Sequence, residues 1–363
     1  MATITAAMVK ELREMSGAGM MDCKKALTEC DGNMEAAVEA LRKSGAMKAE
    51  KKASRIAAEG ICRIAKADGK AAVLEVNSET DFVAKNETFQ TFVEKIVEQV
   101  VTSDVANVEE LLAATWIDDS SKTVNDALVE KVATIGEKLS IRRFEKVEAP
   151  IVVGYIHGGG RIGVIVGAEG TKSDATEEAL TNIAMQIAAM NPQYASRDDI
   201  SADELAKLRE ITIDSALNDP ASLPKPILNK LIEKAMTENL WSAEDKAIYE
   251  EKKSNMNFLF NFLSKEAAAT LAQLAMDGKA EYVADKIFSG LVEGRISKQV
   301  KEICLMDQTY VKAEDGKQTV AQYLKTVSAD LKVTKFVRFE TGEGMEKKEE
   351  DFAAEVAKQM AGN

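Results

Sequence analysis

Residues 71–100 have the sequence AAVLEVNSETDFVAKNETFQTFVEKIVEQV, in which a strand pattern, a short polar junction and a helix pattern follow one another. The apolar run Ala71–Val76 is typical of a strand. Beyond the junction, apolar residues recur at the spacing of one helix face, at Phe89, Phe92, Val93, Ile96, Val97 and Val100. A strand that leads directly into an amphipathic helix indicates an α+β fold in which the helix covers one face of a sheet.

The junction TDFVAKN at residues 80–86 places the carboxylate of Asp81 beside the large, rigid side chain of Phe82. Either Ser78 or Thr80 can cap the following helix by accepting backbone N–H bonds, which would leave the acid and the ring in the first exposed turn. Phe82 also lies two helical turns before an apolar residue of the next helix, and this spacing alone favours an ordinary core position. Two hypotheses are therefore open: Phe82 is part of the core, or it projects as a wedge into another protein.

A unit of strand, tight turn, strand and helix occurs twice. The first unit comprises strands at 61–67 and 70–76, joined at Asp68-Gly69, and a helix at 86–102. The second comprises strands at 155–157 and 161–166, joined at Gly158-Gly159-Gly160, and a helix at 176–190. Helices at 108–114 and 124–138 and a strand at 139–144 are predicted between them. We therefore expect a core of two related α+β subdomains, with helices covering one face of each sheet.

The two ends of the chain predict separate helical elements. Residues 1–45 contain three short amphipathic stretches, which predict a small three-helix binding module. The basic residues around 46–58 favour a solvated charged helix or linker over a patch for an acidic surface. In the C-terminal segment 346–363, apolar residues share one helix face, at Phe352, Val356 and Met360. So short a helix is not stable alone, so it must dock either on this chain or on a partner.

The sequence between the second unit and the C-terminus predicts a helical appendage. Three prolines, Pro220, Pro224 and Pro226, end a helix predicted at 202–217. Further helices are predicted at 227–240, 243–253, 258–276 and 282–300, and strands at 304–311 and 333–339. The predicted domains are a three-helix module at 1–45, a basic linker at 46–58, core subdomains at 59–150 and 151–200, the appendage at 201–303, returning strands at 304–345 and a docking helix at 346–363.

The composition excludes several classes of function. The 363 residues include 47 basic and 60 acidic ones, and the formal charge of −13 argues against nucleic acid as the main partner. The four cysteines lack metal-ligand spacing, so we expect free thiols in a reducing compartment. With His157 as the single histidine and no phosphate-binding loop, we expect neither an enzyme nor a bound cofactor or metal. The sequence has no membrane-span or signal pattern, which favours a soluble, cytoplasmic protein.

Three motifs, in order, resemble the bacterial elongation factor Ts family: SGAGMMDCKKAL at 16–27 followed by RKSG at 42–45, TDFVAKN at 80–86, and FAAEVA at 352–357. The resemblance implies a guanine nucleotide exchange factor that binds the GDP form of elongation factor Tu and promotes GDP release. It also implies an N-terminal module similar to ubiquitin-associated domains, a core of two subdomains, a coiled-coil-like appendage and a C-terminal docking helix. The alternative is a ubiquitin-associated-like adaptor without exchange activity.

The resemblance further implies roles for individual residues. Elongation factor Tu is a GTPase that holds Mg²⁺ beside its nucleotide. The resemblance implies that Thr80, Asp81, Phe82 and Val83 dislocate this Mg²⁺, with Phe82 as the wedge. Partner contacts are implied for Met20, Met21, Lys24, Lys25, Phe352 and Val356. His157 resembles a family position near the same interface, although a lone histidine at a hairpin turn is more often simply exposed. Residues 214–279 have no close counterpart in the family pattern, so we expect an enlarged appendage.

Overall fold

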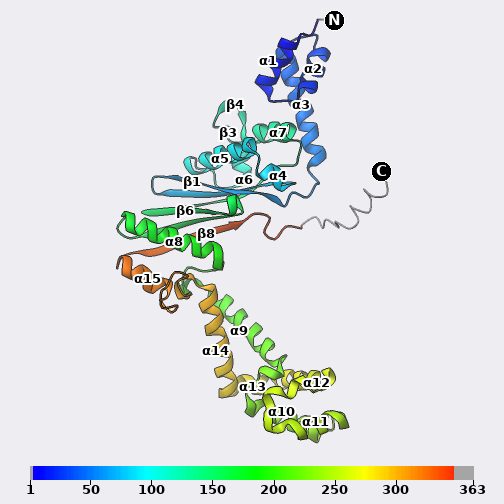
Figure 1. Ribbon diagram of the computed structural model, residues 1–363, viewed down its shortest axis with the longest axis vertical. Coiled ribbons are helices and arrows are strands. Elements are labelled where there is room, and N and C mark those ends of the chain that lie inside the picture. Colours follow the sequence, from blue (N-terminus) through cyan, green and yellow to red (C-terminus); the bar gives the residue numbers. More distant parts are fainter. Residues whose placement is uncertain (1–2, 347–363) are drawn as a thin grey trace. The chain divides into compact units, whose positions relative to one another are not determined.

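The structure, a computed structural model, describes residues 3–346 (Figure 1). The chain divides into two compact units, each with its own hydrophobic core. Among the described residues, the first comprises residues 3–191, Tyr310–Lys312 and residues 321–346. The second comprises Pro192–Thr309 and Ala313–Val320. No helix in the described part of the chain combines the length and apolar character needed to cross a membrane.

Three helices form the N-terminal module: α1 (Ala6–Ser16), α2 (Met20–Glu29) and α3 (Met34–Lys52). The side chain of Thr5 caps α1 and that of Asn33 caps α3, because each accepts a backbone N–H bond from the first turn. The inner faces of the helices meet at buried apolar residues, including Leu12, Leu27 and Ala37. The three predicted helices are confirmed, and the basic stretch after residue 45 begins as part of α3.

The first sheet has the antiparallel order β1-β2-β5, with β1 (Glu59–Ala67), β2 (Lys70–Ser78) and β5 (Ser140–Glu148). Helices α5 (Glu87–Thr102) and α7 (Val124–Ile135) cover one face of it, in a core that joins Leu74 of β2 to Phe89 of α5. The remaining elements of this half are α6 (Val108–Ala113), β3 (Thr115–Trp116) and β4 (Asp119–Thr123). The strand and helix predicted from residues 71–100 are confirmed.

The second sheet has the order β6-β7-β8, with β6 (Ile151–His157), β7 (Ile162–Glu169) and β8 (Lys332–Glu340). Helix α8 (Asp174–Met190) packs on β6 and β7. The turn η1 (Gly158–Gly160) joins these two strands, and α15 (Val320–Val327) precedes β8. The second hairpin and helix are therefore also confirmed, as is the strand predicted at 333–339.

The two sheets pack face to face, each with the side that its helices leave open (Figure 1). Cys62, Val73 and Val147 of the first sheet meet Val152, Ile165 and Phe339 of the second. Glycines of β7 permit this close approach, because a Cβ atom at Gly167 would lie 2.4 Å from the side chain of Val147. The two sheets and the helices that cover them thus form four layers, and β2, the central strand of the first sheet, is buried along nearly its whole length.

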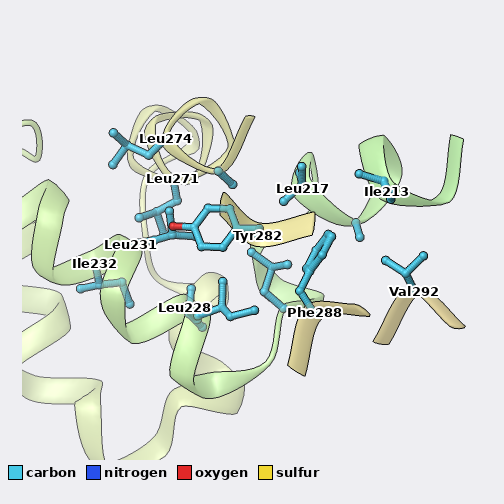
Figure 2. Close-up of a cluster of buried hydrophobic side chains, with 14 of the residues drawn as sticks. Ile213, Leu217, Leu228, Leu231, Ile232, Leu271, Leu274, Tyr282, Phe288 and Val292 are labelled. Carbon is cyan, nitrogen blue, oxygen red and sulfur yellow. The ribbon is translucent and has the colours of Figure 1, made fainter. Parts of the chain in front are cut away.

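Helices form most of the second unit: α9 (Ala202–Leu217), α10 (Lys225–Thr237), α11 (Ala243–Lys252), α12 (Lys265–Asp277), α13 (Lys279–Ala284) and α14 (Lys286–Ile303). Short 3-10 segments lie at η2 (Arg197–Asp199), η3 (Pro220–Ser222), η4 (Lys253–Asn261) and η5 (Leu305–Asp307). Figure 2 shows the buried cluster in which Leu217, Leu228, Leu271, Tyr282 and Phe288 meet from five different helices. The predicted helical segment is confirmed, and its helices share one core.

Three predicted elements in this part of the chain are wrong. The helix expected at 258–276 begins only at Lys265, after its cap Ser264. The helix expected at 282–300 is divided at Asp285, whose side chain caps α14. The strand expected at 304–311 is instead η5, and Cys304 donates its N–H to Val300 to finish α14. Capping side chains end and begin helices regardless of the apolar spacing around them, so periodicity alone missed these breaks.

Candidate functional site

The TDFVAKN junction forms a one-turn helix, α4 (Asp81–Ala84), between β2 and α5. Thr80 caps it, because the threonine hydroxyl accepts the backbone N–H of Val83. Val83 and Ala84 are buried, whereas the side chain of Phe82 is 79% exposed. The hypothesis that Phe82 belongs to the core is therefore wrong, and its ring projects into solvent.

A break between two helices explains why the seven-residue spacing was misleading. The side chain of Asn86 accepts the N–H of Phe89 and begins α5, so α4 and α5 are separate helices. Phe89 is fully buried, in contrast to Phe82. A seven-residue spacing places two residues on the same face only within one continuous helix, and Phe82 and Phe89 belong to different helices.

Asp81 and Lys85 form an ion pair beside the exposed ring, with 2.6 Å between Oδ2 and Nζ. The hydrogen bond from Lys85 holds the pKa of the Asp81 carboxyl below its usual value. Both side chains are largely exposed. The α4 turn therefore presents an apolar ring, a carboxylate and an ammonium group together at the surface.

A groove of about 470 Å³ lies between α4 and the η1 turn of the second hairpin. Asp81 and Lys85 line it on one side, and Gly159 and Arg161 line it on the other. The fold thus brings the TDFVAKN junction next to a turn that is far away in the sequence. Of the predicted site residues, Asp81 lines this groove and His157 does not.

The other predicted contact residues are more widely distributed. The outer face of α2 carries Met20, Met21, Lys24 and Lys25, all of them exposed, with Met21 exposed to 76%. His157 is exposed at the end of β6, and its Nδ1 lies 2.9 Å from the hydroxyl of Tyr155. Phe352, Val356 and the predicted C-terminal helix lie outside the described residues.

The structure also places a residue at α4 that the sequence did not indicate. Glu137, in the loop after α7, accepts hydrogen bonds from the backbone of Glu79 and from both the backbone and the hydroxyl of Thr80. The helix expected at 124–138 would have included Glu137, but α7 ends at Ile135 and Gly136 caps it in a left-handed conformation. The contact joins loops separated by more than fifty residues, and no local pattern could have predicted it.

The exposed groups on α4 have the chemistry of a protein-binding surface. In residues 3–346, no group of three or more His, Cys, Asp or Glu side chains is placed to hold a metal ion. An exposed aromatic ring flanked by charged groups is instead typical of an interface anchor, since aromatic residues contribute a large share of binding energy where they become buried.

Known proteins are similar to this chain along nearly its whole length. The sequence model of the family described as elongation factor TS matches residues 79–244 and 254–343. The elongation factor Ts of Clostridioides difficile is 43% identical over 366 residues, which cover 99% of this chain and 100% of the relative. That of Clostridium novyi is 43% identical over 98% of this chain and 99% of the relative, and that of Halothermothrix orenii is 41% identical over 97% of each.

These matches correct one expectation. Residues 214–279 were expected to lack a counterpart in the family, but alignments that cover 97–99% of this chain must include most of that segment. The family match also continues through it, apart from residues 245–253. The large helical appendage is therefore shared with these relatives. Because the family match covers more than half of the chain and the relatives align end to end, the protein belongs to the elongation factor Ts family.

Proposed function

We propose that this protein is a guanine nucleotide exchange factor for elongation factor Tu. It binds the GDP form of that GTPase and accelerates GDP release, so that GTP can bind during translation elongation. The observation that carries the proposal is the 79% exposed ring of Phe82 on a capped turn, in a member of the elongation factor Ts family. In this role the protein makes and breaks no covalent bond, acts in the cytoplasm, and binds neither nucleic acid nor membrane directly.

Residues Thr80–Val83 dislocate the partner's Mg²⁺ indirectly in this proposal. Mg²⁺ demands nearly ideal octahedral oxygen coordination, so a small displacement of its surroundings weakens the binding of the metal and of GDP. Phe82 supplies the displacement by entering the GTPase domain as a wedge. An aromatic side chain can bury about 150–250 Å², which is enough to stabilise a rearranged partner surface.

The charged neighbours of Phe82 support contact at the same place. Exposed ion pairs contribute little to stability, so Asp81 can exchange Lys85 for a donor on the partner at small cost. The Asp81 carboxylate is ionised at neutral pH, as is usual for aspartate, and can accept hydrogen bonds from the partner. The groove beside α4 then accommodates partner groups between Asp81 and the turn that follows His157.

One turn of helix is too small for a stable complex, so further contacts are part of the proposal. Specific interfaces bury roughly 1,600 Å² in total, far more than a single ring provides. The outer face of α2 supplies a second patch, in which the exposed Met20 and Met21 are adaptable apolar groups flanked by Lys24 and Lys25. We assign a third patch to the C-terminal Phe352 and Val356, on the strength of the family motif at 352–357.

Linkage limits what such a factor can do. If it weakens GDP binding by some ratio, GDP must weaken binding of the factor by the same ratio. The factor therefore changes the rate of nucleotide exchange and does not set which nucleotide is finally bound. An excess of GTP over GDP in the surrounding solution sets that direction.

The test is to mix the protein with elongation factor Tu that carries fluorescent GDP and to follow the loss of signal after excess unlabelled nucleotide is added. We expect faster GDP release, with a rate that saturates as the concentration of this protein rises. Binding without acceleration would instead support the adaptor function that the three-helix module suggests. Neither binding nor acceleration would refute both functions.

A further inference from the structure

The loop Gly136–Lys138 contacts the segment before α4 through one carboxylate. Oε2 of Glu137 accepts the backbone N–H of Glu79 at 3.1 Å and that of Thr80 at 3.0 Å, while Oε1 accepts the hydroxyl of Thr80 at 2.7 Å. Both oxygens of the carboxylate therefore accept hydrogen bonds from Glu79 and Thr80, the two consecutive residues that precede α4. Hydrogen bonds to an ionised carboxylate are shorter and stronger than those between neutral groups.

The contact is reciprocal. Oε1 of Glu79 accepts the backbone N–H of Lys138 at 2.6 Å, so each loop gives a carboxylate to the backbone of the other. Arg55, just beyond α3, joins the same cluster. Its guanidinium lies 3.2 Å from Oε1 of Glu79, and its carbonyl accepts the ammonium of Lys138 at 2.8 Å. The two loops are thus held to each other at several points.

Thr80 transmits this constraint to α4. Its hydroxyl donates to Glu137 and at the same time accepts the N–H of Val83. Donation to the carboxylate fixes the rotation of the hydroxyl. A lone pair of the hydroxyl oxygen is then directed at the N–H of Val83. A single helical turn is not stable without such tertiary contacts. The direction in which Phe82 projects therefore depends on the Thr80 cap, and the cap depends on Glu137.

We propose that Glu137 is a positioning residue for the wedge: it holds the backbone of Glu79 and Thr80, and the cap of α4, so that Phe82 meets the partner in one orientation. The proposal rests on the exchange function proposed above. Glu137 acts through Phe82 and need not touch the partner. A wedge that is ordered before binding avoids the entropy loss of ordering it during binding.

A double-mutant cycle tests whether Glu137 acts through Phe82. Maximal stimulated GDP release and the half-saturating concentration are measured for wild type, Glu137→Gln, Phe82→Ala and the double variant. If Glu137 acts only through the ring, we expect Glu137→Gln to slow release about tenfold in the wild-type background and less than about twofold beside Phe82→Ala. The half-saturating concentration changes less than the maximal rate, because the other contact patches remain.

The matched control is Glu110→Gln. The Glu110 carboxylate also holds a loop ahead of a helix, since it accepts the backbone N–H of Ala106 and the side-chain amide of Asn107, each at 2.8 Å. This loop precedes α6, whereas the segment held by Glu137 precedes α4 and its Phe82 ring. We expect the control to leave stimulated GDP release within about twofold of wild type, as is usual for sites that do not share partners.

Amide hydrogen exchange gives a second readout that needs no partner. In Glu137→Gln, the amides of Glu79 and Thr80 should exchange at least about tenfold faster, whereas those of the central strand β2 keep their protection. If the wild-type protein fails to accelerate GDP release, the proposed function is wrong, yet the amide rates still decide whether Glu137 orders the wedge turn.

Two results overturn the proposal. One is an equal loss of exchange activity in the wild-type and Phe82→Ala backgrounds, which would mean that Glu137 contacts the partner itself. The other is unchanged amide exchange and unchanged GDP release in Glu137→Gln. If this variant loses the protection of β2 as well, Thr80→Val takes its place in the cycle, because it removes only the shared hydroxyl. Additive effects in that second cycle also overturn the proposal.

Discussion

The carboxylate of Glu75 lies 2.6 Å from Nε of Arg143 in a fully buried position on β2. Three further donors complete its surroundings: Arg142 at 2.9 Å, the backbone N–H of Gly342 at 2.8 Å, and the side chain of Asn77 at 3.1 Å. Gly342 follows β8, so this carboxylate joins the two sheets of the first unit. It lies on the central strand of the first sheet, opposite Cys62 of β1 and Arg143 of β5.

Removal of this carboxylate should destabilise the first unit strongly. In Glu75→Ala, Arg142 loses its acidic partner and Arg143 keeps only the partly exposed Glu343. Breaking a buried ion pair on one side typically costs about 3–5 kcal/mol. Because the Arg142 and Arg143 side chains are partly exposed, we expect the lower end, about 3 kcal/mol, as measured by urea unfolding. The control is Glu145→Gln on β5, an exposed residue whose change should stay within about 0.5 kcal/mol. Equal midpoints for the two variants would contradict this prediction.

The same group predicts how stability depends on pH. Burial alone raises the pKa of Glu75, but the bonds from Gly342, Arg142, Asn77 and Arg143 outweigh burial and hold it below its usual value. The unfolded chain therefore takes up this proton more readily than the folded protein does. The stabilisation is complete above about pH 4.3, the ordinary value for glutamate, and is lost as the pH falls through the lower folded value. In urea titrations, the stability difference between wild type and Glu75→Gln should be constant at neutral pH and shrink in acid.

Phe82→Ala should separate function from stability. Truncation of an interface anchor commonly costs at least about 2 kcal/mol of binding energy, so we expect stimulated GDP release to slow roughly tenfold or more. The melting temperature should hardly change, because the ring is 79% exposed. Phe258→Ala is the matched control, since that ring is 55% exposed but lies in the second unit. This variant should stimulate GDP release from elongation factor Tu at the wild-type rate. A large drop in the melting temperature of Phe82→Ala with intact exchange would show that the ring serves folding.

Local sequence patterns predicted the elements of the fold well and their assembly less well. The two hairpins and the helices behind them follow from alternation and helical spacing, because those patterns depend on neighbours in the chain. The face-to-face packing of the sheets had no such signal, because it depends on Gly163 and Gly167 allowing distant strands to approach. Each glycine alone indicates only a weak point in a strand.

The candidate site shows the same division. The sequence placed Phe82 at a junction, but Asn86 caps a new helix, so Phe82 and Phe89 belong to separate helices and do not share one helix face. Spacing alone favoured burial for that reason. The hydrogen bonds of Glu137 could not be predicted, because they depend on a tertiary contact between the loops at 79–80 and 136–138.

The part of the second unit between α9 and α14 should be dispensable for GDP release. The helices of the second unit have a hydrophobic core of their own, separate from the clusters of the first unit. We expect a variant in which residues 219–284 are replaced by a short Gly/Ser linker to fold and to stimulate exchange, with Leu217→Ser and Phe288→Ser included to keep the cut surface polar. Circular dichroism and GDP release are the measurements. Loss of exchange in a folded variant would mean that the appendage contacts the GTPase, and loss of soluble protein would mean that the first unit needs it.

The last prediction concerns magnesium in the partner. If Thr80–Val83 works by loosening the Mg²⁺ site, the factor has less to contribute once the metal has been removed, because each route weakens the same coordination. GDP release is measured with Mg²⁺ and with chelator, each in the presence and absence of this protein.

We expect a clearly smaller fold-stimulation in chelator that is still above one, since the α2 face and the C-terminal motif can still distort the nucleotide pocket. Phe82→Ala should lose most of its stimulation in Mg²⁺ and differ little from wild type in chelator. Equal fold-stimulation by wild type under both conditions would exclude Mg²⁺ dislocation as the main route and would favour direct disturbance of the phosphate or base contacts.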